Sequence, residues 1–175
     1  MRAVAVEVCI DRRMQWSLGD QQPGCVDPRH SHRRMEVHVH DDVVVLPDGA
    51  PITAVSFVSG EPYRRDRIPD FGLYLDPIWD PPWPHAHLDW PDFGVPRRTD
   101  VVLAALDSLH ERARAGEQVE IGCLGAHGRT GTALALLATS SGVPAATAVD
   151  WVRTAYCPLA VETSEQAAFV AGASG

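Results

Sequence analysis

The sequence predicts an α/β fold with a central, mostly parallel mixed sheet that carries helices on both faces. Two observations favour this class. Short apolar runs with strand-like alternation follow one another along the N-terminal part of the chain, and helix-like apolar runs follow residue 129. The chain has 175 residues, of which 45% are hydrophobic and 22% charged, a composition that suits one ordered domain with a substantial core. We therefore expect residues 1–175 to form a single domain.

Residues 1–70 are expected to supply N-terminal strands and one irregular segment. Residues 3–10 are typical of a first or edge strand, whereas 11–34 are polar and rich in Gly, Pro and Arg, which indicates irregular structure. Two further strands, at 35–46 and 52–58, are separated by a Pro-Asp-Gly turn, which predicts a hairpin.

Residues 71–171 are expected to form the core of the domain. A proline-fixed loop separates two predicted strands, at 71–75 and 85–90, and a helix begins at Thr99 or Asp100 and ends at Gly116. A short strand at 119–123 then leads, through a loop, to predicted helices at 130–141, 145–156 and 162–171.

The loop that follows this last strand, Cys123-Leu-Gly-Ala-His-Gly-Arg129-Thr-Gly, feeds a helix N-terminus. Backbone N–H groups there have no intrahelical partner and the helix dipole is positive, so the turn favours a phosphate dianion and a thiolate. Cys123 is therefore expected to be acidic and nucleophilic. The glycines let the backbone turn inward, and Arg129 adds a bidentate clamp. The predicted phosphate-binding residues are Cys123, Leu124, Gly125, Ala126, His127, Gly128 and Arg129.

This loop resembles the phosphate loop of the cysteine-dependent protein tyrosine phosphatase superfamily, which reads Cys, five residues, Arg, then Ser or Thr and Gly. Two more segments carry the resemblance, which covers residues 71–171. Trp90-Pro-Asp92-Phe-Gly-Val-Pro96 is similar to the family's mobile acid loop, and Val161-Glu-Thr-Ser-Glu-Gln166 is similar to its glutamine-bearing segment. The resemblance implies a small bacterial-type phosphatase with features of the tyrosine-specific and dual-specificity branches.

Each matched residue has an expected role. Cys123 attacks phosphorus in line and carries a phosphocysteine. Asp92 protonates the leaving oxygen and later takes a proton from water, which Gln166 orients. Arg129 binds the phosphoryl oxygens, and Thr130 hydrogen-bonds the sulfur as a leaving thiolate. No metal or cofactor is expected, because the thiolate supplies the nucleophile and the loop supplies the positive charge.

Plainer alternatives stay open for these residues. They are an inert buried Cys123, a turn-forming Asp92, a surface Arg129 and a solvated Gln166. His127 either touches substrate or is solvated, and the solvated state is favoured.

Two departures from the family pattern bear on activity. Gly122 stands where a histidine usually precedes the nucleophile, so a group that orients the cysteine and tunes its acidity is missing, and slower catalysis or a shifted pH optimum is expected. Gly125-Ala126 reverses the Ala-Gly order of the tyrosine-specific branch, and alanine is costly where φ is positive. Phosphoinositide phosphatases carry lysines in this loop and this chain does not, so highly charged inositol substrates fit poorly.

Two other clusters have two interpretations each. Cys25, His30, His32, His38 and His40 offer metal-ligand atoms, with His38 and His40 on one face of a predicted strand. Their spacing matches no standard zinc pattern, so a solvated or interface face is favoured over a metal site. Residues 63–67, Tyr-Arg-Arg-Asp-Arg, either grip an acidic or phosphorylated substrate or form a solvated patch, and the patch is favoured.

Charge and cysteine content exclude some classes of partner. Fifteen arginines, no lysine and 23 acids give a net charge of −8, which argues against nucleic-acid or anionic-membrane binding. We see no targeting signal and no apolar run as long as a membrane helix. The four cysteines are scattered, so a reducing cytoplasm is the expected location.

The resemblance thus implies hydrolysis of phosphate monoesters, on a phosphorylated protein or a small aryl phosphate. Protein phosphotyrosine is favoured because the aromatic residues of the acid loop help to enclose a flat ring. A dual-specificity phosphatase and a catalytically weak, phosphate-binding pseudophosphatase are the alternatives. Arsenate reduction is weaker, because the additional redox cysteines that it needs cannot be placed. The oligomeric state stays open.

Overall fold

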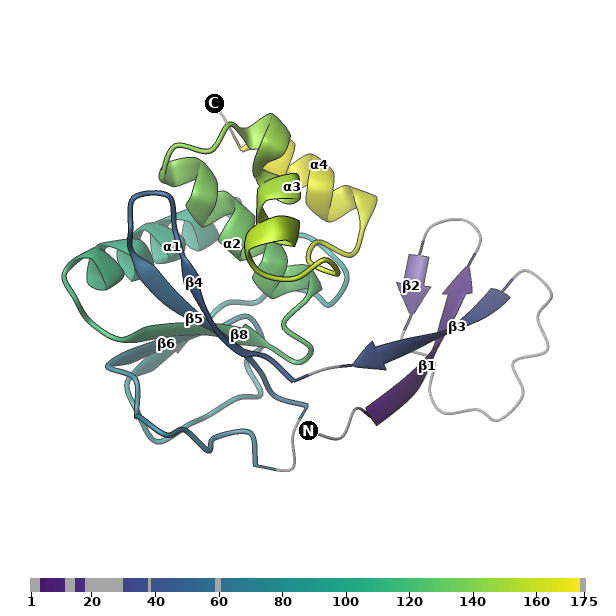
Figure 1. Cartoon of the computed structure of the whole chain (residues 1–175), viewed down its shortest axis with the longest axis horizontal. Helices are drawn as coiled ribbons and strands as arrows, with labels where there is room; N and C mark the ends of the chain where they lie inside the picture. Colours follow the sequence, from purple (N-terminus) through teal and green to yellow (C-terminus); the bar gives the residue numbers. More distant parts are fainter. Residues whose placement is uncertain (1–3, 12–14, 18–29, 38, 59–60, 174–175) are drawn as a thin grey trace.

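The computed structural model of this chain describes residues 4–11, 15–17, 30–37, 39–58 and 61–173, with the backbone alone described as far as residue 37. Figure 1 shows the elements along the chain. They are β1 (Val4–Asp11), β2 (Gln15–Ser17), β3 (His30–Val37), β4 (Asp41–Val45), β5 (Pro51–Ser56), β6 (Phe71–Tyr74), β7 (His85–His87), α1 (Thr99–Arg114), β8 (Val119–Cys123), α2 (Gly128–Ser140), α3 (Ala145–Ala155) and α4 (Ser164–Gly172).

The first three strands form an antiparallel sheet of their own, in the order β2-β1-β3. This corrects two expectations. The segment 11–34 is not irregular throughout, since it holds β2 and the start of β3, and the single strand expected at 35–46 is split between two sheets. The split arises because β3 pairs along its whole length with β1, from Val4 opposite Val37 to Asp11 opposite His30. Such a non-local pairing leaves no local signal in the sequence.

The second sheet has five strands in the order β4-β5-β8-β6-β7. Strands β4 and β5 form the expected antiparallel hairpin, in whose turn Gly49 has φ +91°. The other three pairings are parallel. All five residues of β8 are buried, as in the centre of a parallel sheet covered on both faces. The predicted class, a mostly parallel mixed sheet flanked by helices, is confirmed.

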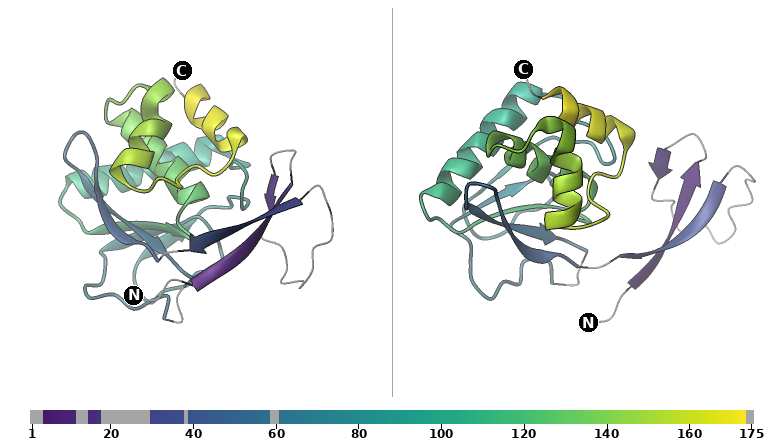
Figure 2. Two further views of the ribbon diagram at one scale, coloured as in Figure 1. Left: turned by 45° about the vertical axis from the view of Figure 1, so that its right-hand side comes forward. Right: turned by 45° about the horizontal axis from the view of Figure 1, so that its top comes forward.

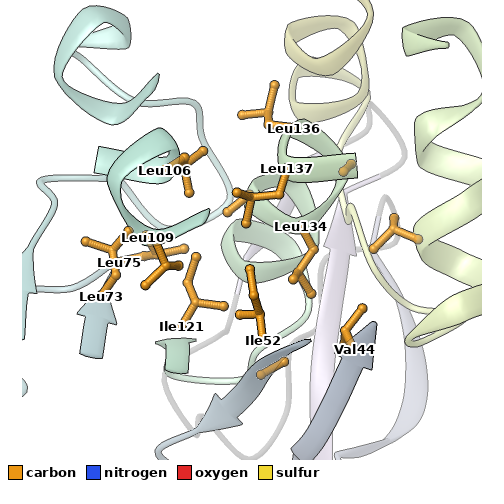
Figure 3. Packing of buried hydrophobic residues seen from close by; sticks show 14 of the residues in the cluster. Val44, Ile52, Leu73, Leu75, Leu106, Leu109, Ile121, Leu134, Leu136 and Leu137 are labelled. Carbon is orange, nitrogen blue, oxygen red and sulfur yellow. The ribbon is translucent and has the colours of Figure 1, made fainter. Parts of the chain in front are cut away.

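The four described helices all lie on one face of this sheet (Figures 1 and 2), where the main core forms. Figure 3 shows side chains from α1, α2 and the sheet meeting there. The helix layer expected on the second face is not found among the described residues. Loop and strand residues cover that face instead, in an aromatic cluster of Val55, Phe57, Tyr63, Tyr74, Trp79 and Trp83.

The arginine-rich segment 63–67 contributes to this second face. The Arg65 guanidinium donates to both carboxylate oxygens of Glu120, at 2.7 and 3.0 Å; the Glu120 side chain is buried and that of Arg65 is 9% exposed. The Tyr74 hydroxyl donates to the same carboxylate at 2.6 Å. The expectation of a solvated patch is therefore wrong for Arg65, which neutralises a buried carboxylate, whereas Arg64 is exposed and pairs with Glu61.

Helix α2 lies at the centre of the helical layer. Its residues from Gly128 to Ala138 are all buried, so the helix is covered on every side, and after Thr132 this buried stretch is wholly apolar. It follows the loop at the carboxyl end of β8. Ligand sites in parallel sheets form at the edge where the carboxyl ends of the strands lie. Within the described residues, none of the helices has the length and apolar character needed to cross a bilayer.

Candidate active site

The predicted phosphate loop connects β8 to α2 and is held from outside by its carbonyl groups. The Leu124 carbonyl accepts from Phe57 N–H at 2.9 Å, and the Ala126 carbonyl accepts from the Tyr156 hydroxyl at 2.7 Å. The His127 carbonyl accepts from the N–H groups of Gly131 and Val161, at 2.9 and 3.2 Å. The Gly128 carbonyl accepts from the Thr132 hydroxyl at 2.7 Å. A trans peptide points its N–H away from its carbonyl. The N–H groups that follow these carbonyls are therefore directed to the opposite side, into the loop, which is the arrangement that an anion-binding cradle requires.

The glycines of the loop do not all serve the backbone turn. Ala126 has φ +57°, in the left-handed region that costs a residue with a side chain about 1–2 kcal/mol, whereas the φ of Gly125 is not positive. Gly128 and Gly131 are instead needed for close approach: an added Cβ would lie 2.3 Å from Glu162 Oε2 at the first and 2.7 Å from Ala160 Cβ at the second. The left-handed position in this loop is thus occupied by Ala126 and not by Gly125.

Cys123 lies at the end of β8 with 3% of its surface exposed. Its Sγ accepts a hydrogen bond from the Thr130 hydroxyl at 3.1 Å. Burial raises the pKa of the Cys123 thiol, and Arg129, the Thr130 hydroxyl and nearby backbone N–H groups lower this pKa by less. Desolvation of the thiolate thus opposes the expected acidity, and it is the largest of these effects.

The residue before the nucleophile is glycine for a steric reason. A Cβ on Gly122 would lie 2.7 Å from both Cγ2 and the carbonyl oxygen of Val55, and 3.0 Å from the Phe57 ring. The strand β5 and the aromatic cluster therefore leave no room for a histidine at this position.

Arg129 is 4% exposed, and hydrogen bonds from Nη1 hold one end of its guanidinium in place. Its Nη1 donates to the carbonyls of Leu75 and Trp90, at 2.9 and 3.2 Å, and to Asp76 Oδ2 at 3.2 Å. Its Nη2 lies 3.2 Å from Asp92 Oδ1. Its buried Nε has no hydrogen-bond partner among the described residues. A buried donor without a partner is costly, so this nitrogen fits an anion bound in the loop.

The predicted acid loop lies against the phosphate loop through the Asp92–Arg129 contact, and the Asp92 side chain stays 44% exposed. Trp90 anchors the loop: its indole is buried, donates to the Gly94 carbonyl at 2.9 Å and packs edge-on against Phe169. The positive φ of this loop, +57°, belongs to Phe93 and not to Gly94.

Gln166 is fully buried at the start of α4. It completes a capping box with Thr163: its backbone N–H donates to the Thr163 hydroxyl, and its side-chain oxygen accepts from the N–H groups of Glu162 and Thr163. Its Nε2 donates to the Gly94 carbonyl at 3.3 Å. The alternative of a solvated glutamine is therefore wrong, and the side chain joins the C-terminal segment to the acid loop.

Glu162 is a site residue that the sequence analysis did not single out. Its carboxylate accepts from the Gly128 N–H, one of the cradle donors, and burial together with the nearby Asp92 raises its pKa to about 7. A carboxylate at this point takes one of the donors that an anion would use. The available signal was its place in the glutamine-bearing segment, four residues before Gln166.

His127 is buried and contacts His40, so the expectation that it is solvated is wrong. His40 is not on a strand face as expected, since it lies just before β4. Of the other expected metal ligands, Cys25 and His38 lie outside the described residues, and only the backbone of His30 and His32 is described.

Comparison with known proteins identifies relatives of this chain. No protein-family model matches it. Uncharacterized protein MJECL20 of Methanocaldococcus jannaschii is 36% identical over an alignment of 115 residues that covers 60% of this chain and 76% of that protein. Uncharacterized protein MJ0215 of the same organism is 32% identical over an alignment of 129 residues that covers 68% of this chain and 79% of that protein.

Two solved structures are similar in fold. Tk-PTP in its active form matches 73% of this chain and 92% of its own, with 28% identity and a TM-score of 0.59. Kinase associated phosphatase matches 77% and 92%, with a TM-score of 0.59, but its 14% identity supports the fold alone. The chain belongs to the cysteine-dependent protein tyrosine phosphatase superfamily, which confirms the resemblance seen in the sequence.

Proposed function

We propose that this chain hydrolyses phosphate monoesters through a phosphocysteine on Cys123, with protein phosphotyrosine as the favoured substrate. The observation that carries the proposal is Arg129 Nε, a buried donor with no partner among the described residues, beside a loop whose N–H groups are directed inward. A tetrahedral phosphate supplies acceptors for the guanidinium and the amides together, and these contacts strengthen as negative charge develops during phosphoryl transfer.

In the first step, Cys123 reacts as the thiolate, its thiol proton having passed to solvent; Sγ forms a bond to phosphorus as the bond to the leaving oxygen breaks, and Asp92 gives that oxygen a proton. This role of Asp92 is supported by its partial exposure and by its contact with Arg129. In the second step, water attacks the phosphocysteine, Asp92 takes a proton from it, and the thiolate leaves while Thr130 donates to its sulfur. We assign orientation of this water to the Gln166 amide.

The preference for phosphotyrosine depends on the acid loop. Because Trp90 is buried as an anchor, Phe93 is the aromatic residue of this loop that is left to contact a substrate ring. Phosphoserine and phosphothreonine reach less far from the peptide backbone than phosphotyrosine does. Hydrolysis of these shorter residues as well, which is dual specificity, is the alternative. The raised pKa of Cys123 favours a second alternative, a phosphate-binding protein with weak turnover. The reducing cytoplasm stays the predicted location, since it suits a reactive thiol.

The test is steady-state hydrolysis of p-nitrophenyl phosphate and phenyl phosphate. Cys123→Ser should abolish turnover while phosphate still binds. Asp92→Asn should lower kcat by about 100-fold or more, with a larger loss for phenyl phosphate, whose leaving group needs the proton more. The matched control is Asp89→Asn, because Asp89 is an exposed aspartate paired with Arg97, and it should leave kcat unchanged. No turnover by the unmodified chain at any pH would leave the binding protein as the function.

Phosphopeptides carrying tyrosine, serine or threonine then decide the substrate class. A kcat/KM that is at least about tenfold higher for phosphotyrosine supports the tyrosine-specific assignment, and equal values support dual specificity.

A further inference from the structure

A cluster of three buried metal-ligand side chains lies behind the phosphate loop, apart from the catalytic sulfur. His40 comes from the segment before β4, His127 from the phosphate loop, and Cys157 from the segment after α3. Their exposed fractions are 3%, 4% and 1%. One ligand atom from each lies within 4.8 Å of the other two. Segments far apart in the sequence thus bring two imidazoles and a thiol together.

The orientation of His40 is set by a carboxylate. His40 Nδ1 lies 2.5 Å from Asp42 Oδ2, which makes Nδ1 the donor nitrogen and leaves the lone pair on Nε2. That Nε2 faces His127 Nε2 at 3.1 Å. Histidines that bind metals usually have this arrangement: one ring nitrogen donates to a carboxylate, which fixes the tautomer, and the other ring nitrogen faces the ion.

The distances are close to those of a tetrahedral ion. With Zn–N bonds of about 2.05 Å and a Zn–S bond of about 2.3 Å, tetrahedral angles put two nitrogens about 3.4 Å apart and nitrogen and sulfur about 3.6 Å apart. The observed nitrogen pair differs from this by a few tenths of an ångström. The sulfur, within 4.8 Å, needs a movement of about 1 Å, which a small side-chain rotation supplies.

The surroundings also suit a cation. Asp42 brings a negative charge to the outer side of His40. The Tyr156 ring packs on His40, with centroids 4.7 Å apart, and its hydroxyl is used by the Ala126 carbonyl, so the ring closes the cluster without competing for the ion. Two imidazoles and one thiolate are a borderline-soft set, which selects zinc and similar ions over calcium or magnesium.

We propose that His40, His127 and Cys157 bind one divalent transition-metal ion of the zinc type behind the phosphate loop. On binding, the two Nε2 atoms and the sulfur each form a bond to the ion, and the thiol releases its proton to solvent. The ion would join the loop to the segments before β4 and after α3, and so fix the position of His127. This is a site distinct from the reacting atoms, and its test does not depend on phosphatase activity.

The probe is Co²⁺, added to the full chain after treatment with a chelator. One equivalent should produce a thiolate-to-cobalt charge-transfer band and the visible bands of tetrahedral cobalt. Cys157→Ser should remove the charge-transfer band, and Cys123→Ser, the matched control at a second buried cysteine of the described residues, should retain it. A band that follows Cys123 instead would place the ion at the nucleophile and overturn the proposal. No band in the unmodified chain would overturn it too, leaving a histidine–histidine hydrogen bond.

A second variant pair decides the case if Cys157→Ser does not fold. Asp42 has a side chain 56% exposed, so Asp42→Asn should fold, and it should weaken Zn²⁺ binding in calorimetry by about 10–100-fold because His40 loses its orienting carboxylate. The control is Asp41→Asn, on the exposed neighbouring aspartate, which should bind as the unmodified chain does. Equal affinities in the two variants would show that His40 is not a ligand.

Discussion

Replacing Gly131 by alanine should push α2 away from the segment that carries Glu162 and Gln166. The new Cβ would lie 2.7 Å from Ala160 Cβ, 2.9 Å from Val161 N and 3.0 Å from Ala160 Cα. Carbon atoms in contact are normally about 3.5–4.0 Å apart, so the segment must retreat by about 1 Å. Its retreat is opposed from the other side, because Arg153 donates to the carbonyls of Ala160 and Val161 at 3.0 and 2.9 Å.

The expected cost follows from two opposed effects. Overpacking costs about 1–3 kcal/mol, whereas exchanging glycine for alanine within a helix gains about 1 kcal/mol, so Gly131→Ala should destabilise the fold by about 1 kcal/mol. Gly172→Ala is the matched control: it lies at the end of α4, and no atom would lie within 4 Å of its Cβ. The two variants should differ by about 1–2 kcal/mol, or roughly 2–8 °C in Tm.

Thermal unfolding followed by circular dichroism measures this difference, and p-nitrophenyl phosphate turnover reports the displaced segment. Gly131→Ala should lower kcat/KM, and Gly172→Ala should not. If the two variants melt at the same temperature, the contact between α2 and residues 160–161 is looser than the structure has it, and the packing argument for Gly131 fails.

Three more predictions concern charged groups. The rate of Cys123 alkylation by iodoacetamide should still rise about tenfold per pH unit at pH 8, because a raised pKa keeps the thiolate scarce at that pH. A rate that reaches its plateau below pH 7 would contradict the effect of burial on this pKa. Glu162 loses its proton near pH 7, so KM for phosphate esters should rise through that pH because the Glu162 carboxylate repels the substrate phosphate. Glu162→Gln should flatten this pH dependence. A KM profile that the variant leaves unchanged would remove Glu162 from the site. Arg65→Met should lower the free energy of unfolding by about 3 kcal/mol in urea titrations, since Glu120 stays buried without its partner, whereas Arg64→Met on the exposed neighbour should cost less than about 0.5 kcal/mol.

The sequence predicted the elements whose signals are local. The strand at 119–123, the helix that begins near Thr99 and the Pro-Asp-Gly hairpin turn lie where apolar periodicity and turn residues placed them. The phosphate loop could be predicted for the same reason, because the strand, the turn and the helix N-terminus that it requires are contiguous in the chain. Comparison with Tk-PTP supports that assignment at the level of the fold.

What the sequence could not predict depends on contacts between distant segments. Arg65 was placed on the surface because nothing near it in the chain shows that Glu120 is buried and needs a counter-charge. The environment of Cys123 is only partly visible for a similar reason: the helix N-terminus can be read in the sequence, but the desolvation that opposes an acidic thiol comes from the packing around the strand end. The cluster of His40, His127 and Cys157 has no spacing rule, since its members come from three parts of the fold.

Backbone strain gives an independent indication of where the function lies. Among the described residues, the non-glycine residues with positive φ are Phe93, Ala126 and Val161, and one belongs to each of the three loops of the proposed site. The φ of +61° at Val161 is the most costly, because a β-branched side chain strongly disfavours the left-handed region. Each conformation costs on the order of 1–3 kcal/mol and persists only where the surroundings enforce it. Strain that gathers in the acid loop, the phosphate loop and the glutamine-bearing segment therefore argues that their mutual placement is maintained for chemistry rather than for stability.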